Sequence, residues 1–119
     1  MNNIKSVMIT IKNNIIPFKG FTAITLWPFV FVRKDREQDY THTVENHEAI
    51  HGEQQKEMLI VLFYAWYLIE WLIKWVYYRN SLTAYKNISF EREAYSNQND
   101  IVYLDIRKHY TWTKYIINN

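Results

Sequence analysis

The sequence predicts a small α+β domain in which the strands of a short antiparallel or mixed sheet precede a long helix and shorter helical pieces. β-Branched and aromatic residues with interspersed turn signals fill the first third of the chain. From Val44 onward the apolar residues follow helical spacing. The 119 residues leave room for a single domain, 1–119, and a hydrophobic content of 49% is enough to form its core.

The predicted strands lie before residue 33. Val7–Ile11 alternates in polarity and predicts a short strand, which Lys12–Asn14 ends as a turn. Thr22–Val32 is rich in strand-forming residues, and Pro28 within it indicates an edge strand or a bulge. The polar run Arg33–Tyr40 predicts a solvated loop.

The predicted helices follow this loop. Thr41 or Thr43 can cap a helix that runs from Val44 to about Arg79, and its length suggests a kink near Gly52–Gln55. Asn80–Asn87 is expected to be a connection. Two shorter helical pieces are expected after it, at Phe90–Asn97 with Ser89 as its cap and from Ile101 to about Tyr110.

One part of the long helix raises the question of a membrane. Met58–Ile69 is uncharged, and the apolar character continues to Tyr78 with Glu70 and Lys74 inside it. These two residues are spaced i,i+4 with the acid first, which favours an ion pair. Because a charge in hydrocarbon is costly, the pattern favours a buried core helix. The alternative is that the aromatic helix 58–78 inserts into a membrane or docks on a membrane or a protein partner.

Composition excludes several functional classes. The absence of Cys excludes disulfide scaffolds, Cys-based zinc fingers, iron–sulfur sites and thiol nucleophiles. A formal net charge of +2 is too small to indicate a nucleic-acid partner. Met1–Phe18 contains two lysines and no uninterrupted apolar block, which is not typical of a secretory signal, so we expect an intracellular location.

The residues His47-Glu48-Ala49-Ile50-His51 form an H-E-x-x-H sequence. On a helix His47 and His51 lie one turn apart on the same face, so both imidazoles can reach one zinc ion. Glu48 lies beside them and is suited to take a proton from a zinc-activated water. The motif therefore predicts metal-dependent hydrolysis of a peptide or protein substrate with Glu48 as the general base.

A catalytic zinc needs a third protein ligand and an open position. Phe90–Tyr95 offers two carboxylates about 40 residues downstream, Glu91 and Glu93. Residues two apart on a helix point about 200° away from each other, so only one of the two can face the metal.

With these residues the chain resembles the gluzincin group of the zincin metallopeptidases. The resemblance lies in His47–Gln54, where Gln follows the second His by three places, and in Glu91-Arg92-Glu93-Ala94. Small H-E-x-x-H-x-x-Q proteins and the prenyl-protein and heat-shock membrane peptidases share an E-x-x-A-D helix of this form. Carried over, the resemblance makes Glu91 the third zinc ligand and puts Tyr95 where the family has a supporting Asp. Support for the zinc histidines must then come from elsewhere.

The resemblance implies a minimal zincin-like metallopeptidase: a short sheet packed on an active-site and backing helix pair, plus a glutamate helix. It also implies that an edge strand within Thr22–Val32 holds an extended substrate by β-augmentation. Candidates to stabilise the oxyanion are His42, Tyr103, Arg107, His109 and Tyr110. The alternative is a catalytically silent zincin-like structural or interaction module in a larger or membrane-associated assembly, in which zinc would only stabilise a small core.

Overall fold

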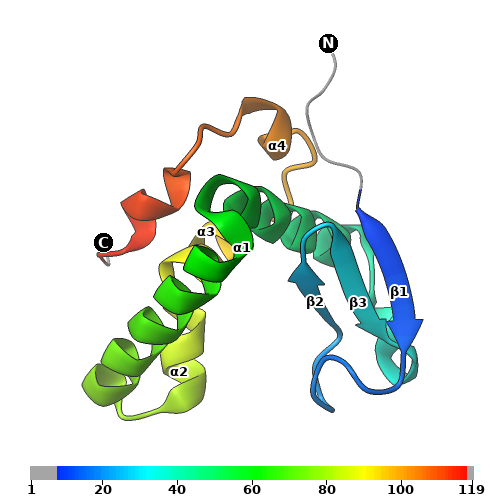
Figure 1. The fold of residues 1–119 in the computed structure, drawn as a ribbon, viewed down its shortest axis with the longest axis horizontal. Helices are drawn as coiled ribbons and strands as arrows, with labels where there is room; N and C mark the ends of the chain where they lie inside the picture. Colours follow the sequence, from blue (N-terminus) through cyan, green and yellow to red (C-terminus); the bar gives the residue numbers. More distant parts are fainter. Residues whose placement is uncertain (1–7, 118–119) are drawn as a thin grey trace.

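The structure is a computed structural model that describes residues 8–117 (Figure 1). It confirms the α+β class: a three-stranded mixed sheet is followed by one long helix and several short ones. The strands are β1 (Ile9–Asn13), β2 (Ala23–Leu26) and β3 (Phe29–Arg33), in the order β1-β3-β2. β3 pairs in parallel with β1 and antiparallel with β2.

The sheet differs from the predicted strands in two places. β1 continues through Asn13, so the turn begins later than predicted, and residue 7 at its predicted start lies outside the described residues. The predicted segment Thr22–Val32 is two strands, because Trp27 and Pro28 form the turn between the paired residues Leu26 and Phe29. The hairpin makes β2 an edge strand of the sheet.

The predicted loop Arg33–Tyr40 is instead largely a 3₁₀ helix, Lys34–Asp39. The long helix α1 then runs from His42 to Tyr78. Thr41 is its N-cap, as one of the two predicted candidates, and its side chain accepts a hydrogen bond from the backbone N–H of Val44. At the other end Arg79 adopts a left-handed conformation that closes the helix.

Helix α1 is sharply bent, but not where the sequence predicts. The non-helical residue is Leu59, with φ 57° and ψ 128°, rather than one within Gly52–Gln55. We call residues 42–58 the inner half and 60–78 the outer half; Figure 1 shows them diverging from the bend. Gly52 serves a different purpose, because a Cβ there would lie 3.0 Å from the Met8 side chain at the edge of the sheet. Its small size lets the sheet lie close on the inner half.

Four short helical segments follow among the described residues: α2 (Ser81–Lys86), α3 (Ser89–Asn97), α4 (Tyr103–Ile106) and a 3₁₀ helix, Thr111–Tyr115. The predicted connection Asn80–Asn87 is therefore mostly helical, with Asn80 as its cap. The predicted last piece from Ile101 to Tyr110 is shorter than expected. Helix α3 begins at Ser89 itself, whose N–H and hydroxyl both donate to the Glu70 carboxylate at 2.7 and 2.6 Å.

The buried apolar side chains form two clusters on either side of the bend. One joins the inner half of α1 to α3 and α4, and the other joins the outer half to α3 and the carboxy-terminal segment. Their fully packed members are Ile50, Ala94, Tyr103 and Leu104 in the first cluster and Phe63, Ile88, Phe90 and Trp112 in the second. The expectation that 58–78 is a buried core helix is wrong, because most of the side chains in this segment are exposed to solvent.

Candidate metal centre

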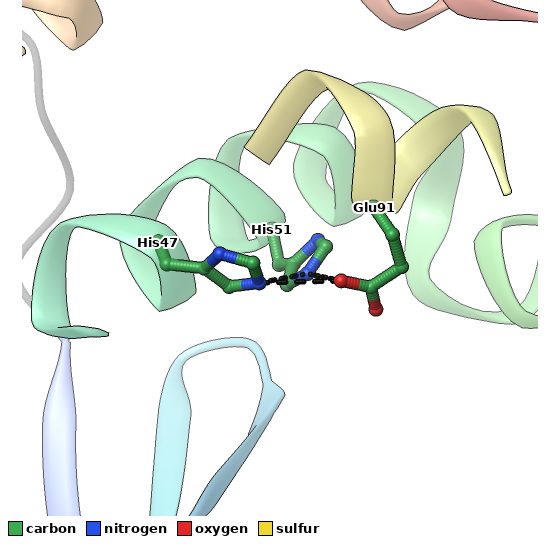
Figure 2. A group of neighbouring side chains, drawn as sticks. All are labelled: His47, His51 and Glu91. Atoms are coloured by element: carbon green, nitrogen blue, oxygen red, sulfur yellow. Dashed lines mark hydrogen bonds and ion pairs between the residues drawn. The ribbon is translucent and has the colours of Figure 1, made fainter. Parts of the chain in front are cut away.

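Helix α1 presents His47 and His51 one turn apart, and α3 presents Glu91 to the same point (Figure 2). All three side chains are buried. The two Nε2 atoms lie 3.2 Å apart, and each is 3.2 Å from Oε1 of Glu91. Three ligand atoms from two elements thus converge on one point, and this group could hold a metal ion.

The spacing of these atoms tests whether a metal fits. In tetrahedral coordination with bonds of 2.0–2.1 Å, neighbouring ligand atoms lie about 3.3 Å apart. The three observed separations, each 3.2 Å, agree with this value. Two histidines and one carboxylate also make a donor set that leaves a fourth position open.

The charges of the histidine and glutamate side chains stabilise one another. Burial disfavours a charged His51, but the neighbouring Glu91 carboxylate outweighs burial and raises the pKa of His51 to about 9. Burial alone would raise the pKa of Glu91, yet the charge on His51 and hydrogen bonds from both histidines lower it well below its usual range. A proton on His51 therefore occupies the place that a cation would take.

Each histidine is oriented by a glutamine. The Nδ1 atom of His47 lies 2.7 Å from Oε1 of Gln98, and that of His51 lies 2.8 Å from Oε1 of Gln54. An amide oxygen accepts a hydrogen bond from the Nδ1–H, so each histidine in its neutral form would offer the Nε2 lone pair to a bound ion. Tyr95, at the position where gluzincins have the supporting Asp, instead packs edge-on against the imidazole of His47, with 4.5 Å between the ring centroids. Gln98 was missed by the sequence analysis, because its spacing from the motif carries no signal.

Glu93 has a different role from Glu91. It points away from the histidines and accepts hydrogen bonds from Tyr103 (2.6 Å), Gln54 (2.8 Å) and Arg107. Arg107 also donates two hydrogen bonds to Glu57, at 3.0 and 2.8 Å. Glu93 therefore holds Gln54, which in turn holds His51, so this buried network supports the site without belonging to it.

The Glu91 carboxylate is fixed by a residue that the sequence analysis did not single out. The Tyr67 hydroxyl donates to Oε2 of Glu91 at 2.6 Å, leaving Oε1 directed at the histidines. Tyr67 lies on the outer half of α1, so the bend at Leu59 is what brings it to the site. A bend of this kind has no signature in the helical spacing, so the sequence indicates Tyr67 only as one of the aromatic residues of helix 58–78.

Glu48 is buried beside the cluster and lines a cavity that reaches the histidines. Its Oε1 accepts a hydrogen bond of 2.7 Å from the hydroxyl of Thr25 on β2. Thr25 was not predicted as a site residue. It links the edge strand to the helix and fixes the orientation of the Glu48 carboxylate.

A cavity of about 460 Å³ reaches this site. One wall comes from β2 and the preceding loop, and the other comes from the outer half of α1 and from α2. The lining includes exposed Phe18 and Leu68 as well as buried His47, so the cavity runs from the surface to the histidines. Most of the other lining side chains are apolar or aromatic: Pro17, Phe21, Ala23, Ile24, Phe63, Tyr64, Tyr67, Trp71 and Tyr85.

The five predicted oxyanion candidates do not line this cavity. Tyr103 and Arg107 bind Glu93, and Tyr110 donates to the backbone of Glu57. His42 and His109 lie at the surface. The phenols in the cavity wall are instead Tyr64, Tyr67 and Tyr85.

Comparison of the chain with protein-family models, curated protein sequences and solved structures gives no match. The similarity to gluzincins thus stays a prediction. It rests on the motif residues and on the geometry of this site.

Proposed function

We propose that the protein is a zinc-dependent metallopeptidase of minimal gluzincin type. The observation that carries the proposal is the convergence of Nε2 of His47, Nε2 of His51 and Oε1 of Glu91 at 3.2 Å from one another, at the inner end of an open cavity. A structural zinc site is closed by four protein ligands, whereas a hydrolytic site has three and is open to substrate. Three ligands facing a cavity support the hydrolytic alternative over a silent module.

Zinc is the metal that this donor set favours. Imidazole nitrogens suit zinc and other transition metals, whereas magnesium and calcium prefer sets made of oxygen atoms. When bound, zinc would polarise the scissile carbonyl and lower the pKa of a coordinated water to about 7.

Glu48 acts as the general base in this proposal. Its carboxylate takes the proton of the attacking water and passes it to the amine of the leaving product. The Thr25 hydroxyl holds Oε1 of Glu48 at 2.7 Å, which leaves Oε2 to accept the proton. Burial beside the histidines keeps this carboxylate next to the reacting groups.

The substrate is a peptide in extended conformation that pairs with the free edge of β2. The carbonyl of Thr22 accepts a hydrogen bond from the backbone N–H of Arg33 on β3. Because backbone hydrogen-bonding groups alternate in direction along a strand, those of Ala23 and Thr25 point away from β3, toward the free edge. The Thr25 carbonyl is already bonded to Gln55, at 2.8 Å. Ala23, which lines the cavity, is therefore the position where a substrate strand would pair.

Tyr85 is suited to stabilise the oxyanion. It lines the cavity, and its hydroxyl lies 3.3 Å from the hydroxyl of Tyr95, which can accept or donate. Burial raises the pKa of Tyr85 well above its ordinary value, so the phenol keeps its proton and remains a donor. Tyr67, by contrast, is already committed to Glu91.

Metal analysis tests the site. Protein purified without added zinc and then exposed to one equivalent is expected to hold one zinc per chain, measured by mass spectrometry of the metal. His47→Ala and Glu91→Gln should lose it. Glu45→Gln is the matched control, since this carboxylate lies on the same helix at the surface. Full zinc content in Glu91→Gln would show that the third ligand is another residue.

Turnover tests the reaction. With a library of internally quenched peptides, the wild type should cleave and Glu48→Gln should lose about 10²–10⁴-fold in kcat while retaining zinc. Glu45→Gln should cleave normally. A wild type that holds zinc and cleaves no peptide would favour the silent structural module instead.

A further inference from the structure

The outer half of α1 places apolar side chains where a water-soluble helix has polar ones. Its exposed side chains carry no charge: Val61, Leu62, Ala65, Trp66, Leu68, Ile69, Leu72, Ile73, Trp75, Val76 and Tyr77. Several of these side chains are largely exposed to solvent: Ile73 has an exposed fraction of 64% and Val76 one of 78%. Soluble monomers rarely expose continuous apolar patches of this extent.

The two charged residues of the outer half point the other way. Glu70 and Lys74 form an ion pair of 2.7 Å on the side that packs against the rest of the protein. Glu70 also accepts hydrogen bonds from Ser89, and Lys74 donates to the carbonyl of Asn87. In a membrane, ionisable side chains face the protein interior and pair with one another. This polarity is the reverse of that of a surface helix in water.

The width of the apolar surface indicates what covers it. At about 100° per residue, the exposed positions fill an arc of roughly 200°. The buried and half-buried positions fill an arc of roughly 120° on the opposite side of the helix. A second helix in a coiled-coil contact covers only a narrow seam. The exposed arc of roughly 200° is about twice as wide as the apolar stripe of about 100° that a surface helix normally buries. Lipid chains can cover an arc of this width completely.

We propose that the outer half of α1 docks on a lipid bilayer, with this 200° arc in contact with the hydrocarbon of one leaflet. Its 19 residues, 60–78, extend about 28 Å, and Trp66, Trp75 and Tyr77 supply the rings that favour the boundary between hydrocarbon and headgroups. The segment lies along the membrane and does not cross it. Helix α2 packs beside it and keeps Ser81, Thr83 and Lys86 exposed, which a crossing hairpin would bury in lipid.

Vesicle flotation tests the proposal with the full chain. Protein in detergent is mixed with phosphatidylcholine vesicles, the detergent is removed, and the vesicles are floated on a density gradient. The wild type is expected to float equally at 0.1 and 1 M NaCl, because an uncharged arc binds through apolar contact that salt does not screen. Ile69→Lys/Ile73→Lys should float at least tenfold less, since charges replace side chains inside the lipid.

Ile101→Lys is the matched control. Ile101 is also a largely exposed isoleucine, but it lies outside α1, so this variant should float like the wild type. Circular dichroism in detergent checks that all variants retain their helices. Lipids brominated on the acyl chain supply a second measurement: they should quench wild-type tryptophan fluorescence, and Trp66→Phe/Trp75→Phe should lose most of that quenching.

Three outcomes would overturn the proposal. Flotation of the double lysine variant at the wild-type level would place the contact elsewhere. A wild type that leaves the vesicles as a soluble dimer, which Ile69→Lys/Ile73→Lys converts to a monomer, would identify a second copy of the chain as the occupant. Tryptophans that brominated lipid does not quench would exclude contact with hydrocarbon.

Discussion

Arg107 is the residue whose loss is expected to damage the protein most without touching the metal site directly. Its guanidinium lies between Glu57 and Glu93, and the three side chains are exposed by only 3%, 2% and 0%. Arg107→Met keeps most of the side-chain volume but removes the positive charge. Two buried carboxylates would then remain without their cation.

The structure sets the size of the effect. Removing one partner of a buried, hydrogen-bonded charge pair costs about 3–5 kcal/mol of unfolding free energy, against about 5–15 kcal/mol for a whole domain. For a chain of this length each kcal/mol lowers Tm by about 3–6 °C. Arg107→Met should therefore lower Tm by about 9–30 °C in thermal melts followed by circular dichroism.

The same variant should also weaken metal binding, because Glu93 holds Gln54 and Gln54 orients His51. Losing such indirect support costs about 10–100-fold in metal affinity. Lys12→Met is the matched control, since it removes a cation from an exposed ion pair with Glu37 and should cost no more than about 1 kcal/mol. If Arg107→Met melts as high as Lys12→Met, the buried network does not carry the stability assigned to it.

Three further predictions concern the site and the bend. Tyr67→Phe should weaken zinc binding by about 10–100-fold in competition with a chelator, because Glu91 loses the hydroxyl that orients it; exposed Tyr77→Phe should change nothing. Because the pKa of His51 is raised to about 9 from an ordinary value near 6.5, its stabilisation of the metal-free protein is full below pH 6.5 and lost as the pH rises to 9. Melts in EDTA should therefore fall over this range, zinc affinity should rise, and His51→Gln should remove the trend in the melts. Leu59→Gly should raise Tm by a few degrees, since glycine tolerates φ 57° and Leu59 is largely exposed; an unchanged or lower Tm would mean that the bend stores no strain.

Local periodicity explains what could be predicted from the sequence. His47 and His51 lie one turn apart on any helix, so their meeting needed no tertiary information. The opposed directions of Glu91 and Glu93 follow from the same helical geometry, and the structure places them as that geometry requires. The i,i+4 pairing of Glu70 with Lys74 is also confirmed.

Tertiary structure decides the rest of the site. Tyr67 reaches Glu91 only because α1 bends at Leu59, and a leucine with positive φ is not predicted by any propensity. Gln98 reaches His47 from the end of α3, and Thr25 reaches Glu48 from the sheet. Each contact joins residues more than twenty positions apart, so neither spacing nor composition could indicate it.

The error about the outer half of α1 has a specific cause. Because a charge in hydrocarbon is costly, Glu70 and Lys74 argue against lipid only where they face it. Helical spacing places both residues on the stripe of Phe63 and Tyr67, which is the buried one. The sequence therefore already contained the segregation of charge from the apolar arc. The average hydropathy of the segment hides it, whereas the position of each residue around the helix reveals it.

The two halves of α1 share one unusual property, which links the proposed site to the proposed membrane surface. Each half buries ionisable side chains on the face that packs against the protein: the inner half buries Glu48 and its neighbouring histidines, and the outer half buries Glu70. Leu68 belongs to the exposed apolar arc and also lines the cavity that reaches His47. The opening of the cavity therefore borders the surface assigned to lipid. If both proposals hold, a peptide reaches the site from the edge of the bilayer, and apolar lining side chains such as Phe18 and Trp71 favour substrates with an apolar segment near the scissile bond.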